Sequence, residues 1–207
     1  QPRTITAERI VIATGSTPTK LDIPGAELAI TSDEAFALPQ RPERVIMIGS
    51  GYIGIEFAGI FAGLGSQVDL VYRRDLPLRG FDEDMRTALA DAIDARGITQ
   101  HHHANPTSIT RNGAELVLTL DNGQTLRADC IFMATGRRPK IDALGLGKTS
   151  ITTADNGRIQ VDGNSETAHP GIYAIGDVTD RNNLTPVAIA EGHNLADRLF
   201  GQAPPRQ

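Results

Sequence analysis

The stretch VIMIGSGYIGIEFAGIFAGLGSQVDLVYRRDLPLR, residues 45–79, decides the fold class of this 207-residue chain. It begins with four consecutive apolar residues, 45–48, the pattern typical of a strand that is buried on both faces. A G-x-G-x-x-G turn at residues 49–54 follows and leads into an apolar helical segment. A second apolar run, residues 68–72, comes after that helix. This order predicts a strand–helix–strand unit with a dinucleotide-binding fingerprint.

Each glycine of the fingerprint has a physical purpose. Glycines allow the tight turn, the close approach of a pyrophosphate to the backbone, and close packing of the helix on the strand. The start of the helix offers free amides and a partial positive charge to the phosphates. An ordinary glycine-rich strand–helix turn is the simpler alternative. The strand before the motif and the helix after it favour dinucleotide binding.

The end of the second strand indicates which dinucleotide is bound. Folds that bind NAD usually place an Asp or Glu there, on the ribose 2′-hydroxyl. Here the sequence has Tyr72, Arg73 and Arg74, with Arg79 shortly beyond. Guanidinium groups suit a 2′-phosphate, so the sequence predicts NADP rather than NAD. The alternative is a solvated basic loop, and Arg74 fits that alternative best.

Composition and termini narrow the class of protein. The length allows one large domain or two small ones. The net charge of −5 gives no nucleic-acid signal. We find no signal peptide and no apolar run long enough to span a bilayer, and therefore expect a cytoplasmic protein without membrane partners. The chain begins at Gln1 without an initiator Met, so we expect a piece of a longer protein.

Cysteine and histidine usage argues against other chemistry. Cys130 is the single cysteine, which excludes an intrachain disulfide. It lies in an apolar run and is interpreted as a buried strand residue. The three consecutive histidines 101–103 look like a metal site, but neighbouring residues on a strand point to opposite faces. We therefore expect a solvated strand or turn there and no metal site.

The remaining elements complete an α/β pattern. We expect strands over residues 4–13, 98–103, 130–134 and 171–175, a short helix capped by Ser32, a helix over 81–96 closed by Gly97, an antiparallel meander over 106–128 with turns at 112–113 and 122–123, a hairpin around 156–157, and a helix over 186–200 capped by Thr185. The pattern Ala-Thr-Gly-x-x-Pro occurs twice, at residues 13–18 and 134–139. Each copy ends an apolar strand, where ligands bind in open α/β sheets.

Taken together, these motifs resemble those of the FAD-dependent pyridine nucleotide-disulfide oxidoreductase family, with glutathione reductases as the nearest likeness. The matching segments are residues 13–15, 49–56, 73 with 79, 134–137, 172–178 and 184–190. Residues 78–82 favour the glutathione reductases over the dihydrolipoamide dehydrogenases. The resemblance covers nearly all of this chain but only the middle of the family's chain. It implies a Rossmann-like NADP-binding domain, residues 16–138, inserted in a partial FAD-binding domain, residues 1–15 and 139–207.

The resemblance also implies site residues. Those for NADP are Gly49, Ser50, Gly51, Tyr52, Ile53, Gly54, Glu56, Arg73, Arg79, Ala134 and Gly136, and those for FAD are Thr14, Gly15, Gly176, Asp177 and Thr185. Tyr52 matches a tyrosine that covers the flavin until nicotinamide displaces it, and Glu56 a residue that pairs with a lysine on the flavin side. Both would support hydride transfer; the alternatives are a packing aromatic and a solvated glutamate. Asp177 would bind a ribityl hydroxyl, or serve only as a turn residue.

Parts of the family's chain have no match here. These are the amino-terminal FAD fingerprint, the redox cysteine pair, and the carboxyl-terminal domain with the catalytic histidine and the dimer contact. We expect no catalytic cysteine or histidine in this chain, no activity and no stable FAD binding by the chain alone, and a monomer where the complete enzyme is a homodimer. The complete enzyme would pass electrons from NADPH through FAD and a disulfide to glutathione disulfide. Alternatives are a mercuric or trypanothione reductase, or a non-catalytic NADP(H)-sensing module.

Overall fold

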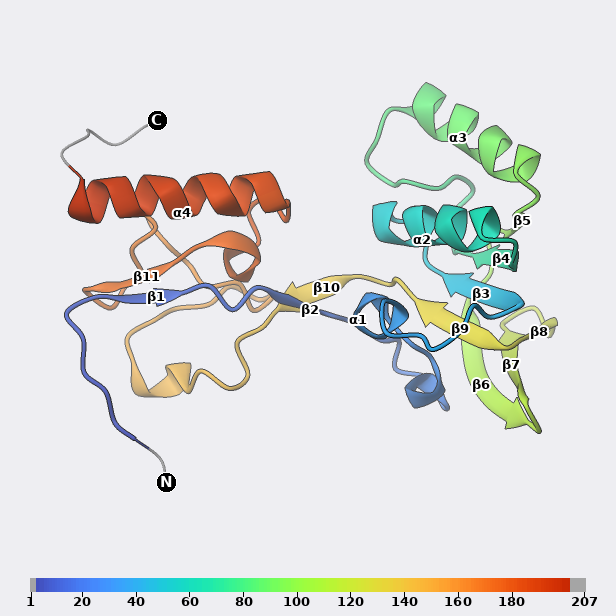
Figure 1. Ribbon diagram of the computed structural model, residues 1–207, viewed down its shortest axis with the longest axis horizontal. Helices are drawn as coiled ribbons and strands as arrows, with labels where there is room; N and C mark the ends of the chain where they lie inside the picture. Colours follow the sequence, from blue (N-terminus) through green and yellow to red (C-terminus); the bar gives the residue numbers. More distant parts are fainter. Residues whose placement is uncertain (1–2, 202–207) are drawn as a thin grey trace. The chain divides into compact units, whose positions relative to one another are not determined.

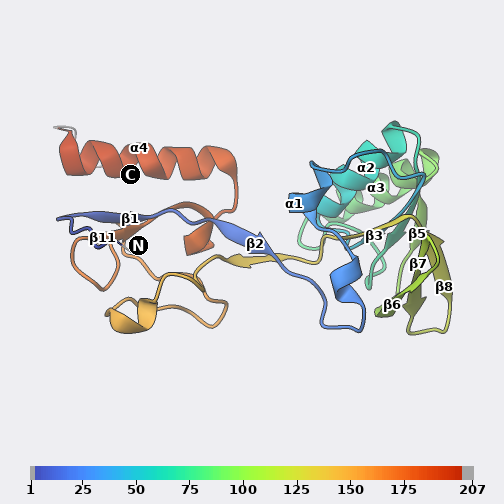
Figure 2. The same cartoon turned by 60° about the horizontal axis from the view of Figure 1, so that its bottom comes forward.

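A computed structural model describes residues 3–201, which divide into two compact units (Figures 1 and 2). Pro18–Gly136 forms one unit, and the described parts of Gln1–Thr17 and Arg137–Gln207 form the other. The chain therefore passes from one unit to the other twice. The antiparallel and parallel sheets alternate with helices along the chain, so the expected α/β class is confirmed.

The unit of residues 18–136 is built on a four-stranded parallel sheet. Its order is β5-β4-β3-β9, with bounds Thr99–His101 for β5, Gln67–Val71 for β4, Arg44–Ile48 for β3 and Cys130–Met133 for β9. Strand β3 lies in the middle and pairs with β4 on one side and β9 on the other. Residues 45–48 are all buried, as the continuous apolar run predicted.

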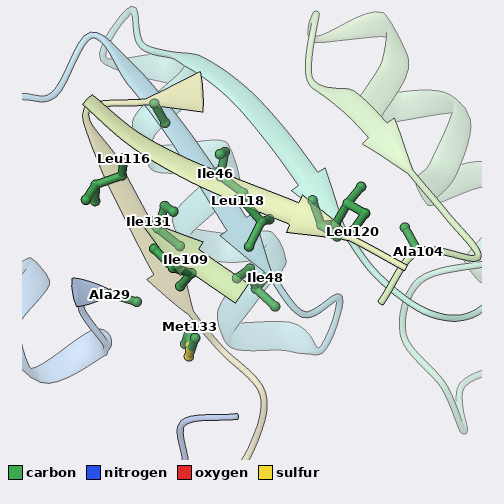
Figure 3. Close-up of a cluster of buried hydrophobic side chains, with 12 residues drawn as sticks. Ala29, Ile46, Ile48, Ala104, Ile109, Leu116, Leu118, Leu120, Ile131 and Met133 are labelled. Carbon is green, nitrogen blue, oxygen red and sulfur yellow. The ribbon is translucent and has the colours of Figure 1, made fainter. Parts of the chain in front are cut away.

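The two faces of this sheet are covered differently, because successive side chains of a strand point to opposite faces. Helices α2 (Tyr52–Gly63) and α3 (Glu83–Ala95) cover one face, where Val45 and Met47 pack with α2 residues. The meander β6-β7-β8 covers the other, with bounds Pro106–Asn112, Glu115–Leu120 and Thr125–Ala128. Figure 3 shows Ile46 and Ile48 beside the apolar side chains of that meander.

Two short helices complete this unit, and one of them begins at a different cap residue than predicted. They are the 3-10 helix Ala26–Leu28 (η1) and helix α1, Ser32–Ala35. Thr31, not Ser32, caps α1: its hydroxyl accepts the amide of Asp33, and Glu34 accepts the amide of Thr31 at 2.7 Å. Thr31 has the extended backbone that a cap requires, whereas Ser32 is already helical.

The ends of α3 and the hairpin of the meander also refine the predictions. Asp82 caps α3, which ends before Gly97, a residue with φ of +75° as expected for a helix stop. The first hairpin turns at residues 113–114, because Asn112 still pairs with Glu115. Strand β5 is shorter than predicted, residues 99–101 in place of 98–103.

The second unit contains two small sheets and one long helix. Its elements are β1 (Ile10–Ile12) paired in parallel with β11 (Ile172–Ala174), β2 (Ser16–Pro18) paired with β10 (Arg137–Pro139), the 3-10 helices η2 (Leu146–Lys148) and η3 (Gly176–Thr179), and α4 (Thr185–Phe200). A buried hydrophobic cluster of this unit consists of Ile12, Ile159, Ala174 and Val178.

Three predictions fail in this unit. The strand expected over residues 4–13 is only three residues long and pairs with the three residues of β11. The Ala-Thr-Gly-x-x-Pro copy at residues 13–18 was expected to end a strand, whereas its residues 16–18 form the further strand β2. Leu184 occupies the cap position of α4 instead of Thr185, and no side chain caps this helix. Pro186 in the first turn has no amide for a cap to bind.

Substitution of a fingerprint glycine tests how closely α2 packs on β3. A Cβ added at Gly54 would lie 2.1 Å from the backbone oxygen of Gly49, so the Gly54→Ala variant must push α2 away from β3. We expect a loss of about 1–3 kcal/mol in the free energy of unfolding, measured by urea denaturation.

Gly59→Ala on the same helix is the matched control. A Cβ at Gly59 meets no atom within 4 Å, so alanine there should stabilise the protein by about 0.5–1 kcal/mol through helix propensity. Equal stability of the two variants would contradict the close packing of Gly54.

Candidate functional site

A pocket of about 560 Å³ lies within the unit of residues 18–136, at the carboxyl ends of strands β3, β4 and β9. It is lined by residues 21–23, 48–52, 71–74, 78, 79, 81, 104–106 and 134–136. Ligands bind at this edge of open α/β sheets, where the strand ends and the loops that follow them converge. The fingerprint turn and the predicted arginines thus share one pocket.

The fingerprint turn is fixed by close backbone contacts. Gly49 has φ of +109°, and its amide donates to the backbone oxygen of Val71 at 2.9 Å. A Cβ on Gly49 would lie 2.3 Å from the backbone oxygen of Ala134. Only glycine therefore fits between β4 and the end of β9.

The start of α2 lies open beside the pocket. Gly51 is the extended cap residue of α2, no side chain caps this helix, and a Cβ at Gly51 would meet no atom within 4 Å. Uncapped amides and the positive end of the helix dipole favour an anion at this place. Ser50 and Tyr52 line the same pocket, and Tyr52 is 46% exposed.

Three arginines, Arg73, Arg74 and Arg79, also line the pocket. All three are exposed, and within residues 3–201 no hydrogen bond or ion pair is found for any of their side chains. Asp22 is the single carboxylate among the lining residues. The pocket therefore combines uncompensated positive charge with exposed helix amides, which suits a phosphorylated ligand.

The pocket includes most of the residues predicted for NADP. Residues 49–52, Arg73, Arg79, Ala134 and Gly136 line it. Three predicted residues lie outside the lining. Gly54 is buried beneath the turn, Ile53 packs against the hydrophobic cluster between the sheet and α2, and Glu56 is exposed on α2.

Several lining residues were not identified from the sequence. Residues 21–23 arrive from a loop that precedes the fingerprint, and Asn105 follows β5. No motif marks either segment. Tyr72 and Phe81 adjoin the predicted arginines, which was a usable signal. The Tyr72 hydroxyl donates to Gln100 at 2.9 Å, and burial, with the nearby carboxylates of Asp94 and Asp75, raises the pKa of Tyr72.

The residues predicted for FAD lie in the other unit. The Ser16 hydroxyl donates to Asp177 at 2.9 Å and accepts from Arg137 Nε at 2.8 Å. Gly176 has φ of +72° and donates its amide to Glu191 of α4 at 2.6 Å. The turn after β1 and the turn after β11 are therefore joined through Ser16 and Asp177.

The other residues of that set are peripheral to this contact. Thr14 donates its hydroxyl to the backbone oxygen of Lys140 at 2.7 Å, and Gly15 has φ of +71°. Thr185 is exposed as the first residue of α4.

The histidine segment holds an internal pair. His101 Nε2 lies 2.6 Å from Asp69 Oδ1, from the neighbouring strand β4. Among the described residues no group of three or more His, Cys, Asp or Glu side chains could hold a metal ion. No helix among residues 3–201 is long and apolar enough to cross a membrane.

Known proteins match this chain over most of its length. The family described as pyridine nucleotide-disulphide oxidoreductase matches residues 1–192. The glutathione reductase of Burkholderia cepacia is 45% identical over 197 residues, 95% of this chain and 44% of that protein. The trypanothione reductase of Leishmania donovani is 47% identical, over 97% of this chain and 42% of that protein.

A solved structure agrees with these relatives. The HOCl-induced flavoprotein disulfide reductase RclA from Escherichia coli matches with a TM-score of 0.91 and 27% identity, over 98% of this chain and 47% of that chain. The chain thus spans less than half the length of the relatives that it matches.

The buried cysteine provides a test of this geometry. Cys130 is 7% exposed on β9, and burial raises the pKa of its thiol to about 11. At pH 8 a much smaller fraction of this thiol is then ionised in the folded protein than of an ordinary exposed cysteine. We expect a disulfide reagent to label Cys130 slowly in the native chain and rapidly in urea, followed by absorbance. Equal rates in both conditions would contradict the burial of this strand.

Proposed function

Because this chain belongs to the pyridine nucleotide-disulphide oxidoreductase family, we propose that residues 16–138 are the NADP(H)-binding domain of a flavoprotein disulfide reductase resembling glutathione reductase. The observation that carries the proposal is that the fingerprint turn and three arginines line one pocket, and that these arginines have no ionic partners among the described residues. The compact unit Pro18–Gly136, which contains the whole pocket, supports the proposed domain borders.

The charges of the pocket suggest how NADP(H) binds. We propose that the pyrophosphate lies at the uncapped start of α2, near Gly51. Arg73 and Arg79 hold the 2′-phosphate at the end of β4, where forked guanidinium donors match phosphate oxygens. The nicotinamide then points toward Tyr52 and the end of β9 at residues 134–136.

Tyr52 and Glu56 suit the nicotinamide end. Tyr52 is half-exposed and lines the pocket, so its ring can move aside when a nicotinamide arrives. Glu56 lies one helical turn beyond Tyr52 on α2 and is exposed, so it is free to contact a group outside this unit. We propose that both support hydride transfer without being the redox groups.

The other unit suits part of an FAD site. We propose that Asp177, held by Ser16, accepts a ribityl hydroxyl, and that Thr14, Gly15, Gly176 and Thr185 border the same cofactor. FAD would supply the electron relay between NADPH and a disulfide. The chain's own residues would orient FAD. The carboxylate of Asp177 would accept a hydrogen bond from a ribityl hydroxyl, and the uncapped start of α4 would favour negative charge on a group placed beside it.

The proposed substrate of the complete enzyme is glutathione disulfide, as in the Burkholderia cepacia relative. The trypanothione reductase of Leishmania donovani is similar to the same degree, so the disulfide of trypanothione is the second candidate. We propose that this chain alone does not reduce either disulfide. An assay of NADPH oxidation with added FAD and glutathione disulfide should therefore show no turnover above the background without protein.

Nucleotide titration tests the proposed binding site. By isothermal titration calorimetry, the chain should bind NADPH much more tightly than NADH, because only NADPH carries the 2′-phosphate that the arginines are proposed to hold. Arg73→Ala and Arg79→Ala should each weaken NADPH binding, with about 1.5–3 kcal/mol at stake for each charge-assisted hydrogen bond. Arg74→Ala should weaken NADPH binding less. Arg73→Ala and Arg79→Ala should leave NADH binding close to that of the parent chain.

Arg111→Ala provides a charge-matched control, since Arg111 is exposed on β6 and lies outside the pocket. Equal affinities of the parent chain for NADPH and NADH would refute the 2′-phosphate site. Binding of neither nucleotide would refute the proposed domain.

A further inference from the structure

The loop between β4 and α3 carries Arg79, and a residue outside the pocket holds this loop in place. Arg86 Nε donates to the backbone oxygen of Pro77 at 2.7 Å, and Arg86 Nη2 donates to the backbone oxygen of Leu76 at 3.1 Å. Arg86 belongs to the first turn of α3 and is partly buried. Its guanidinium therefore donates hydrogen bonds to two adjacent peptide oxygens of the loop.

The next residue of the loop is fixed from the other side. The Leu78 amide donates to the backbone oxygen of Ser50, in the fingerprint turn, at 2.9 Å. Leu78 has φ of +48°, which a residue with a branched side chain rarely adopts unless its neighbours hold it there. Consecutive residues 76–78 are thus bound by α3 on one side and by the fingerprint turn on the other, directly before Arg79.

We propose that Arg86 is a positioning residue that sets Arg79 for the 2′-phosphate and so determines the preference for NADPH over NADH. This inference rests on the proposed function of the pocket. Arg86 does not line the pocket, so it acts through the peptide groups of residues 76 and 77. The planar guanidinium offers two donors in a fixed geometry, which the single ammonium of a lysine does not reproduce.

The position of this loop predicts a selective effect. Arg79 meets the 2′-phosphate, whereas the pyrophosphate lies at the start of α2 and the nicotinamide at the end of β9. Loosening residues 76–78 therefore affects the part of NADPH that NADH lacks. A residue needed only for folding would weaken the binding of both nucleotides alike.

The experiment compares the parent chain with Arg86→Ala, Arg86→Lys and Arg96→Ala by calorimetric titration with NADPH and with NADH. Arg96 follows the same helix at its other end, and in the described part of the chain its side chain has no hydrogen bond or ion pair, so it controls for the loss of one positive charge. Arg86→Lys keeps the charge and removes the fork. Hydrogen exchange of the Leu78 amide, measured without nucleotide, reports the loop directly.

We expect Arg86→Ala to raise the Kd for NADPH about tenfold and to change the Kd for NADH less than about twofold. Arg86→Lys should fall between this variant and the parent chain, and Arg96→Ala should match the parent chain. The Leu78 amide should exchange faster in Arg86→Ala than in Arg96→Ala.

Unchanged NADPH binding in Arg86→Ala overturns the inference, and so does an equal loss for both nucleotides. Full rescue by lysine assigns the effect to charge and overturns the role of the fork. A parent chain that does not prefer NADPH refutes the 2′-phosphate site and, with it, the effect on nucleotide preference. The exchange rate of Leu78 then decides separately whether Arg86 holds the loop.

Discussion

The pocket of the unit of residues 18–136 depends on three backbone segments that touch without intervening side chains. The Cα of Gly54 sits against the backbone oxygen of Gly49, and the Cα of Gly49 sits against the backbone oxygen of Ala134. These contacts bring α2, β3 and β9 together at one point. A Cβ at Gly49 or at Gly54 would separate them, so the position of the helix start, and of the free amides it offers, follows from two missing methyl groups.

The sequence was most informative where structure is decided locally. The buried strand 45–48, the fingerprint turn and the meander follow from apolar patterning and glycine spacing, and all are present. Helix starts were less predictable, because the cap position depends on which of two adjacent residues has an extended backbone. Thr31 took the place expected for Ser32, and Leu184 that expected for Thr185, once the backbone had selected which residue is extended.

The remaining parts of the pocket come from contacts between residues distant in sequence. Asp22 and Asn105 carry no recognisable pattern and reach the pocket because the sheet order brings their segments to the same edge. Arg86 lies on an amphipathic helix among other charged residues, where a solvated arginine is the normal interpretation. Its contact with the peptide oxygens of residues 76 and 77 depends on the path of the loop, which no spacing rule specifies.

The two ends of the pocket-containing unit lie side by side. The Thr19 amide donates to the backbone oxygen of Gly136 at 2.9 Å, so the segment begins and ends at one hydrogen bond. A segment with adjacent ends can occupy a loop of another protein while leaving the host's own chain path almost unchanged. All residues that line the pocket lie between these two ends, so a host chain would need to supply only two neighbouring points of attachment for the whole unit.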